Sequence, residues 1–180
     1  MSGMTVYETE RLIVREWTAA PDDLDRMTDI YTREEVTRWL PPFEFDAVRA
    51  VEGWHAFHEG DRRYGSWAVQ VRDSGIAAGT VLFRPIPGGD GEVEVGWHLH
   101  PDSWGRGYAT EAARGAVERG FASGLEEVYA LVKPDNAASR AVCRRLGMTS
   151  LGRTRRFFDL ESEMFRLRGD GGDNKDGEDG

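Results

Sequence analysis

A strand, a glycine-containing turn and a helix follow one another between residues 92 and 122. Residues 92–100 alternate between apolar and polar side chains, which is the pattern of a half-buried strand. The turn contains Gly105 and Gly107, and residues 111–122 continue as a helix rich in small side chains. The first N–H groups of a helix have no partner within the helix, and the helix dipole favours negative charge there. This stretch therefore predicts an anion site formed by backbone N–H groups.

The whole chain predicts a mixed α/β sheet. Its patterns follow the order strand, helices, three strands, helix, strand, helix, two strands. Short glycine-bearing turns join the three central strands into an antiparallel meander. Strands are expected near residues 10–17, 64–72, 76–85, 92–100, 127–132, 154–160 and 162–167, and helices near 21–31, 33–40, 47–59, 111–122 and 134–146.

The helix at 111–122 acts as a crossover between two neighbouring strands, 92–100 and 127–132, which therefore run parallel. The second of these strands is nearly all apolar, so we expect it to be buried on both faces. Gly96 is expected to mark a bulge that splays the first strand from its neighbour. The glycine turn then lies at the C-terminal edge of a splayed central parallel pair.

Length and charge limit the class of protein. The 180 residues suit a single domain, expected at 1–168, followed by a disordered tail at 169–180 with five acids, five glycines and one lysine. The net charge of -9 argues against a nucleic-acid partner. No signal peptide and no membrane-spanning apolar run is expected. A single cysteine, Cys143, excludes an intramolecular disulfide and fits a cytoplasmic location.

Two motifs carry a resemblance to a known family. Leu99-His100-Pro101, followed by the run Trp-Gly-Arg-Gly-Tyr-Ala at 104–109, resembles the pyrophosphate-binding signature of the GNAT N-acetyltransferase superfamily. Residues 136–139, in a helix that ends at residues 146–148, resemble its second motif for CoA. The segments 10–15 and 104–112 are similar to the corresponding segments of the RimJ/RimL-like subgroup. Members of this subgroup acetylate protein N-termini, and some relatives modify small molecules. The resemblance spans about residues 8 to 168 and agrees with the predicted element order.

The resemblance implies acetyl-CoA as cosubstrate and no metal. Its pyrophosphate would lie on the backbone of the glycine turn, and its acetyl-pantetheine arm would enter where the parallel strands splay. The backbone N–H of Leu99 would then polarise the thioester carbonyl. The residues expected to bind the cofactor are Leu99, Trp104, Gly105, Arg106, Gly107, Tyr108, Ala109, Thr110, Asn136 and Ser139.

The acceptor amine must lose a proton before it attacks, and a carboxylate on the 92–100 strand suits that task. Glu94 is the first candidate for this base, and a surface carboxylate without a catalytic role is the alternative. Glu92 and His98 are weaker candidates. For protonating the CoA thiolate the candidate is Ser139, whose alternative role is support of the helix cap.

Two positions depart from the family pattern. Trp104 stands where the signature has Gln or Arg, and Cys143 stands where the family often has a general-acid tyrosine. These departures motivate an alternative function, a non-catalytic acyl-CoA-binding module. Cys143 is expected to be a buried small apolar residue.

The expected partner is an amine acceptor, either a protein N-terminus or a small molecule. No nucleic acid or membrane partner is expected, and a homodimer stays open. Three aromatic residues, Trp39, Phe43 and Phe45, either line the acceptor side or belong to the core. The pairs His98-x-His100 and His55-x-x-His58 are weak evidence for metal, since they come from distant elements without a carboxylate pattern.

Overall fold

The computed structural model describes residues 3–169, and within them eight strands form a single sheet. The strands are β1 (Thr5–Glu8), β2 (Leu12–Arg15), β3 (Gly65–Val71), β4 (Ala77–Pro85), β5 (Val93–Leu99), β6 (Glu127–Val132), β7 (Thr149–Thr154) and β8 (Ser162–Arg168). The helices are α1 (Pro21–Thr32), α2 (Glu34–Thr37), α3 (Ala47–Gly60), α4 (Tyr108–Ala122) and α5 (Ala137–Arg145), and η1 is a 3-10 turn at Pro101–Ser103. Their spatial order in the sheet is β1-β2-β3-β4-β5-β6-β8-β7.

This architecture confirms the predicted mixed α/β class and its central parallel pair, with corrections at both ends of the sheet. The sequence pattern does not predict β1, because its four residues form an edge strand that is at most half-buried. β7 occupies 149–154 instead of the predicted 154–160. Residues 155–161 form a connection in which Phe158 and Asp159 have positive φ angles of 56° and 53°. Phe157 in this connection is buried, so the segment carries an apolar residue as a strand would.

Smaller differences concern three other elements. α4 begins at Tyr108, three residues before the expected start. β6 alternates between buried and half-buried residues and is therefore not buried on both faces. The predicted tail lies outside the described residues apart from Gly169. None of the helices in the described part of the chain is long and apolar enough to cross a membrane.

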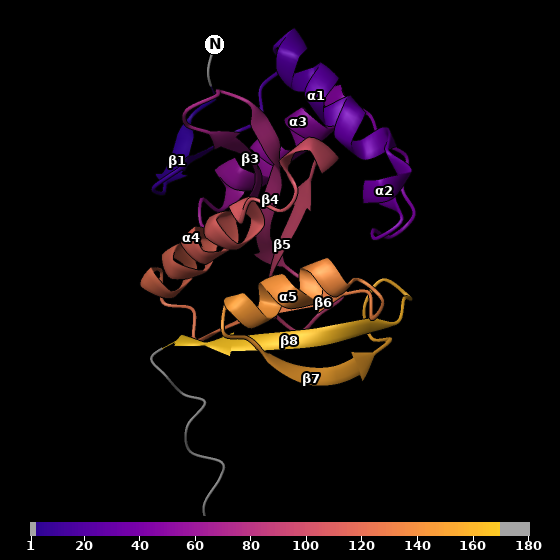
Figure 1. Ribbon diagram of the computed structural model, residues 1–180. Helices are drawn as coiled ribbons and strands as arrows, with labels where there is room; N and C mark the ends of the chain where they lie inside the picture. Colours follow the sequence, from indigo (N-terminus) through magenta and orange to yellow (C-terminus); the bar gives the residue numbers. More distant parts are fainter. Residues whose placement is uncertain (1–2, 170–180) are drawn as a thin grey trace, which may run out of the picture.

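Apolar clusters cover both faces of the sheet. Trp67 belongs to a large cluster that includes α4, whereas its neighbour Ala68 belongs to a second cluster with residues of α1 and α3. Successive residues of a strand face opposite sides, so the two clusters lie on opposite faces. In Figure 1, α4 and α5 cross in front of the strands, and α1 and α2 lie beside them at the upper right. The sheet is thus a central layer between two sets of helices.

Small residues let α4 lie close to the sheet. A Cβ atom at Gly120 would come within 2.4 Å of the Phe83 ring, and one at Gly115 within 2.5 Å of the Tyr7 ring. Ala112, Ala113 and Ala116 on the same helix are fully buried or nearly so. The small-residue run in the sequence therefore reflects close packing, which fixes the position of the helix start beside β5.

The two parallel strands separate soon after they meet. β5 and β6 are paired at one position, Glu94 with Tyr129, whereas β6 pairs with β8 over its whole length. The predicted bulge at Gly96 is absent, because Gly96 pairs in regular register with Leu82 of β4. β6 follows β8 and diverges from β5, which leaves a gap between β5 and β6. The gap opens on the C-terminal side of Glu94.

A buried ion pair anchors α1 to the sheet. Both Nη atoms of Arg15 donate to the carboxylate of Asp23, at 2.8 and 2.9 Å, and the N–H and hydroxyl of Thr18 donate to it as well. Burial raises the pKa of Asp23, but the hydrogen bonds from Arg15 and Thr18 outweigh it and hold the pKa below its usual value. The ionised pair therefore stabilises the fold at neutral pH, and this contribution is lost in acid as the pH falls through the lowered pKa.

We predict that Asp23→Ala destabilises the protein by about 3–5 kcal/mol, since it leaves the Arg15 guanidinium buried without its partner. Urea unfolding followed by circular dichroism measures this loss. Asp61→Ala is the control, because the Asp61–Arg63 pair is exposed and a surface pair contributes little. Equal unfolding midpoints for Asp23→Ala and Asp61→Ala would contradict the prediction.

Candidate active site

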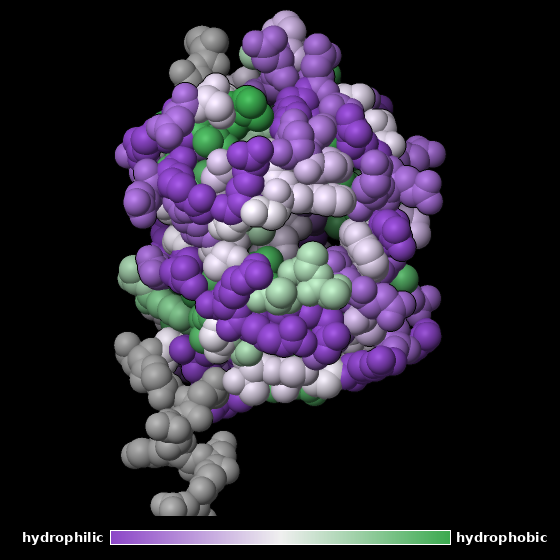
Figure 2. All heavy atoms as spheres, viewed as in Figure 1, coloured by the Kyte–Doolittle hydropathy of each residue, from purple (hydrophilic) through white to green (hydrophobic). Residues whose placement is uncertain are grey.

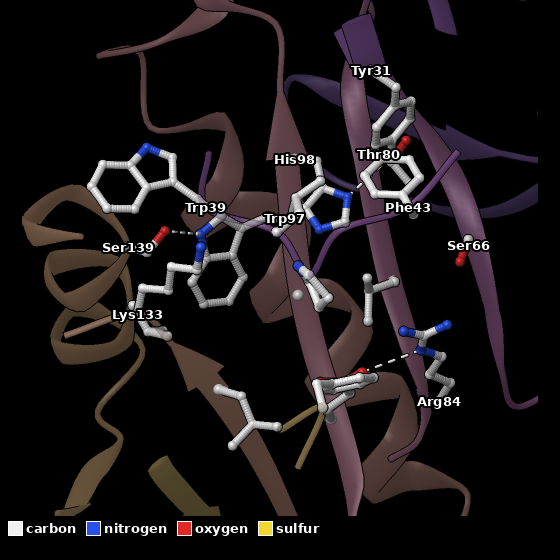
Figure 3. A pocket seen from close by; sticks show the side chains of 18 of the residues that line it. Tyr31, Trp39, Phe43, Ser66, Thr80, Arg84, Trp97, His98, Lys133 and Ser139 are labelled. Atoms are coloured by element: carbon white, nitrogen blue, oxygen red, sulfur yellow. Dashed lines mark hydrogen bonds and ion pairs between the residues drawn. The ribbon is translucent and has the colours of Figure 1, made fainter. Parts of the chain in front are cut away.

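A cavity of about 860 Å³ runs through the gap between β5 and β6. One end is lined by β6, by Lys133 and by the start of α5, and the other by β4, β5 and the aromatic residues of α1, α3 and the α2–α3 connection. Figure 2 shows a hollow near the centre of a mostly hydrophilic face, above α5. Figure 3 shows side chains from both ends, including Ser139 and Lys133 on one side and Tyr31, Phe43 and Arg84 on the other.

Backbone N–H groups of β5 point into this gap. The N–H of His100 donates to the carbonyl of Ala78 in β4, at 2.8 Å. Hydrogen-bonded positions of an antiparallel pair alternate with positions whose N–H groups point the other way. The N–H groups of Trp97 and Leu99 therefore point away from β4, toward the side where β6 has diverged.

The start of α5 faces the same gap. The Asn136 side chain accepts a hydrogen bond from the N–H of Ser139 at 3.1 Å and so caps the helix. The indole N–H of Trp97 donates to the Ser139 hydroxyl at 3.2 Å, which bridges β5 and α5 (Figure 3). Ser139 receives its capping bond through its backbone, so its hydroxyl proton can point to another acceptor.

Glu94 lines the cavity at the one position where β5 pairs with β6. Its side chain is 9% exposed, and its Oε1 accepts a hydrogen bond from Nε of Arg84 at 3.2 Å. Burial raises the pKa of Glu94, and the positive charge of Arg84 offsets only part of this effect. A carboxylate with a raised pKa in a cleft is suited to general-base chemistry near neutral pH.

The weaker candidates for the base are less suitable. Burial lowers the pKa of His98 to about 4, and its Nδ1 lies 3.0 Å from the Tyr31 hydroxyl. His98 is therefore neutral at physiological pH and holds a proton poorly. Glu92 forms an ion pair with Arg156 at 2.5 Å and is not among the residues that line the cavity.

Aromatic rings form the far wall of the cavity. Tyr31 contacts Phe43, Phe45 and Trp54, with ring centroids 6.0, 4.6 and 6.3 Å away. Phe43 is 47% exposed and lines the cavity, as do Trp39 and Phe45. These three residues of the α2–α3 connection therefore line the cavity, and Phe45 also packs against the apolar cluster of α1 and α3.

The glycine turn leads into α4 with the geometry of an anion-binding loop. Gly105 and Gly107 have positive φ angles of 71° and 79°, and Gly107 is the N-cap of α4. The N–H groups of the first helical turn have no acceptor within the helix, and glycine lets a ligand approach the backbone. The Thr110 hydroxyl is buried in this turn and has no hydrogen-bond partner among the described residues. These features fit a bound pyrophosphate.

Ion pairs hold the turn from two sides. Arg11 donates to the Arg106 carbonyl at 2.8 Å and pairs with Glu111 at 2.7 Å, while its guanidinium lies over the Tyr108 ring. Glu111 also accepts a hydrogen bond from the Thr9 hydroxyl. Its negative charge, close to the start of α4, is therefore balanced by Arg11 and Thr9. The chain segment before β2 thus supports the loop, a contact that the sequence pattern does not reveal.

On the other side, His100 connects η1 to α1. Its Nε2 lies 2.8 Å from Asp29, and its Nδ1 accepts from the N–H of Asp102 at 3.1 Å. Arg26 pairs with Asp102 at 2.8 Å, and these hydrogen bonds hold the pKa of Asp102 well below its usual value. These contacts tie the turn that precedes the glycines to α1.

The two departures from the family pattern have structural explanations. The Trp104 indole donates to the Leu99 carbonyl at 2.9 Å, so its side chain links the loop to β5. Cys143 is fully buried in the larger core cluster, as expected, and burial raises the pKa of its thiol to about 12. It is not among the residues that line the cavity.

Most of the predicted catalytic and arm-binding residues come together around the cavity. Glu94, Asn136 and Ser139 line it directly, and Leu99 adjoins it at the end of β5. Sequence reasoning missed Arg84, Tyr31 and the role of Trp97 in bonding Ser139. Arg84 pairs with Glu94 across the β4–β5 hairpin. The sequence does not predict this pairing, because the length of the connection at 86–92 leaves the register of the two strands open.

His55 and His58 bond to the carbonyls of Trp17 and Tyr64. Within residues 3–169 no group of three or more possible ligands could hold a metal.

Comparison with known proteins identifies the family. Residues 11–149 match the family model described as the acetyltransferase (GNAT) domain, so the chain belongs to the GNAT acetyltransferases. It is similar to the uncharacterized N-acetyltransferase YoaA of Bacillus subtilis, with 27% identity over 157 residues that cover 84% of this chain and 87% of YoaA.

Two further similarities are to proteins of stated activity or ligand. An L-methionine sulfoximine/L-methionine sulfone acetyltransferase of Pseudomonas aeruginosa is 35% identical over 83 residues, which cover 42% of this chain and 48% of that enzyme. The structure of Mycobacterium smegmatis RimJ in complex with CoA-disulfide has a TM-score of 0.67 at 21% identity, covering 88% of this chain and 82% of that one. The family and its relatives identify an acetyl-CoA-dependent acetyltransferase.

We predict that Gly107→Val lowers CoA affinity by about tenfold or more, because a β-branched side chain at a φ of 79° strains the loop. A Cβ at this position also approaches Arg11, which supports the loop. Isothermal titration calorimetry with CoA measures the change.

Gly124→Val is the matched control for this experiment. Gly124 has a φ of 100° at the other end of α4, so the substitution introduces similar backbone strain away from the loop. Equal losses of CoA affinity in both variants would show that general destabilisation, and not the loop, is responsible.

Proposed function

We propose that the protein transfers an acetyl group from acetyl-CoA to a primary amine by direct attack in a ternary complex. The acceptor amine belongs to a protein N-terminus or to a small molecule. The observation that carries this proposal is the continuous cavity, which joins the gap between β5 and β6 to the buried carboxylate of Glu94. A cofactor arm on one side and an amine on the other can meet there without a covalent acetyl-enzyme.

Two protein groups have roles in the attack on the thioester. Acetyl-CoA supplies the acetyl group as an activated thioester. The N–H of Leu99 donates a hydrogen bond to the carbonyl oxygen under attack, which its direction toward the gap supports. Glu94 accepts the proton that the acceptor amine loses, and its raised pKa supports this role at neutral pH.

The Ser139 hydroxyl is proposed to donate a proton to the departing sulfur and to regain one from solvent. It lines the cavity on the α5 side, and the hydrogen bond from Trp97 makes its oxygen less basic and its proton easier to give up. Cys143 takes no part, because its thiol is buried in the core with a raised pKa.

The cofactor is proposed to lie with its pyrophosphate on the loop 104–110, held by the backbone of Gly105, Gly107, Ala109 and Thr110. Arg106 would add charge beside it. Asn136 and Ser139 would contact the arm at the start of α5. We also propose that the protein works in the cytoplasm, since its one cysteine suits a reducing compartment.

We predict that Glu94→Gln lowers kcat/KM by about 100-fold or more, because the amide cannot accept the amine proton. The wild-type kcat/KM falls as the pH drops through the raised pKa of Glu94, above the ordinary range of a glutamate, and the variant loses this acid limb. Thiol release from acetyl-CoA with an amine acceptor, followed across pH, measures both effects.

Glu92→Gln serves as the control for Glu94→Gln. It changes a carboxylate on the approach to the same strand, but that side chain pairs with Arg156 and does not line the cavity. The control should keep the wild-type pH profile. An unchanged rate in Glu94→Gln would remove Glu94 as the base.

We predict that Ser139→Ala lowers kcat by about 100-fold, a larger effect than on CoA affinity, since the proton donor for the thiolate is lost together with one contact to the arm. Cys143→Ala tests the position of the family's usual tyrosine and should retain the wild-type kcat. Rapid-quench measurement of a single turnover, together with CoA titration, separates chemistry from binding. A normal single-turnover rate in Ser139→Ala would assign the proton donation to solvent or to another group.

A further inference from the structure

Arg84 presents unused hydrogen-bond donors to the cavity beside the proposed base. Its Nε donates to Glu94, and its side chain is 34% exposed. Among the described residues it has no hydrogen-bond or ion-pair partner other than Glu94. Figure 3 shows its terminal nitrogens directed away from the Glu94 bond, on the side of Ser66. A guanidinium offers five donors in a planar fork, so most of its capacity is open to a ligand.

The charge of Arg84 also acts on two titratable groups that line the cavity, Glu94 and His98. Its charge contributes to the lowered pKa of His98 and opposes the raised pKa of Glu94. Of the other cations that line the cavity, Lys133 donates to the Arg38 carbonyl at 2.7 Å, and Arg49 is exposed on α3. A partly buried cation with open donors is best satisfied by an anionic group on the ligand.

The contact between Arg84 and Glu94 limits how far apart the acceptor's groups can be. Nε of Arg84 and Oε1 of Glu94 are 3.2 Å apart, so an amine on Glu94 and an anion on Arg84 must lie within a few ångströms of each other. An α-amino acid meets this requirement, because one carbon joins its amine to its carboxylate. A protein N-terminus has a neutral amide in place of that carboxylate.

Aromatic residues adjoin this pair. Tyr31, Phe43, Phe45 and Trp54 line the same end of the cavity and form a connected set of ring contacts. Such a wall favours an apolar side chain on the acceptor. We propose that the acceptor is a free α-amino acid with a large apolar side chain and that the carboxylate of this amino acid binds Arg84. This inference rests on the proposed function.

The test measures binding of reaction products, because binding does not depend on turnover. Calorimetry of the enzyme–CoA complex uses N-acetyl-L-phenylalanine, N-acetyl-L-tryptophan, N-acetyl-L-methionine and N-acetyl-L-leucine, each paired with its amide. At least one acid should bind about tenfold or more tightly than its amide, since the amide lacks the charge that pairs with Arg84. This preference should disappear in Arg84→Gln, which keeps a hydrogen-bond donor beside Glu94.

Arg49→Gln is the matched control, because it removes an arginine at the exposed rim of the same cavity. The preference for acid over amide should persist in this variant. Three outcomes would overturn the proposal: equal binding of acid and amide in all four pairs, a preference that survives in Arg84→Gln, or a preference that is lost in Arg49→Gln.

Failure of this inference and failure of the proposed function give different results. If amines without a carboxylate support Glu94-dependent thiol release while acids and amides bind alike, the inference is wrong and the function stands. If acids bind through Arg84 and no amine supports thiol release, the proposed transfer is wrong and the anion site stands.

Discussion

The divergence of β5 and β6 is the constraint on which the site depends. Sheets normally continue their hydrogen bonds from strand to strand, yet this pair is joined at Glu94 and Tyr129 and then separates. Because β6 is paired along its length with β8, it cannot follow β5, and N–H groups of β5 are directed into a cavity instead of a ladder. The same separation brings the start of α5 and residues of β4 and β5 to one cavity.

The surrounding contacts serve to keep this opening rigid. Small residues hold α4 against the sheet, and Arg11, Glu111, His100 and Asp29 fix the loop at its start. Glu94 and Arg84 lie on strands, and Asn136 and Ser139 lie at the start of α5. A preformed arrangement of this kind lowers the ordering that ligands must induce when they bind.

Local patterns predicted most of the fold, and they failed where long-range packing decides the outcome. The 104–110 turn and the helix after it were predictable, because glycine placement and small-residue periodicity are local signals. The strand at 149–154 was not, since Phe157 and Phe158 give a strand-like pattern to a connection. The absence of a bulge at Gly96 and the pairing of Arg84 with Glu94 depend on register across the sheet, which a single sequence does not specify.

The most direct test of the central claim is the initial-velocity pattern with acetyl-CoA and an amine acceptor varied together. The cavity joins both substrates at one place, so the account predicts intersecting double-reciprocal lines and no acetylated enzyme by intact-protein mass spectrometry when the acceptor is omitted. Parallel lines together with an acetylated enzyme would indicate a covalent intermediate. That result would contradict direct transfer across the gap between β5 and β6.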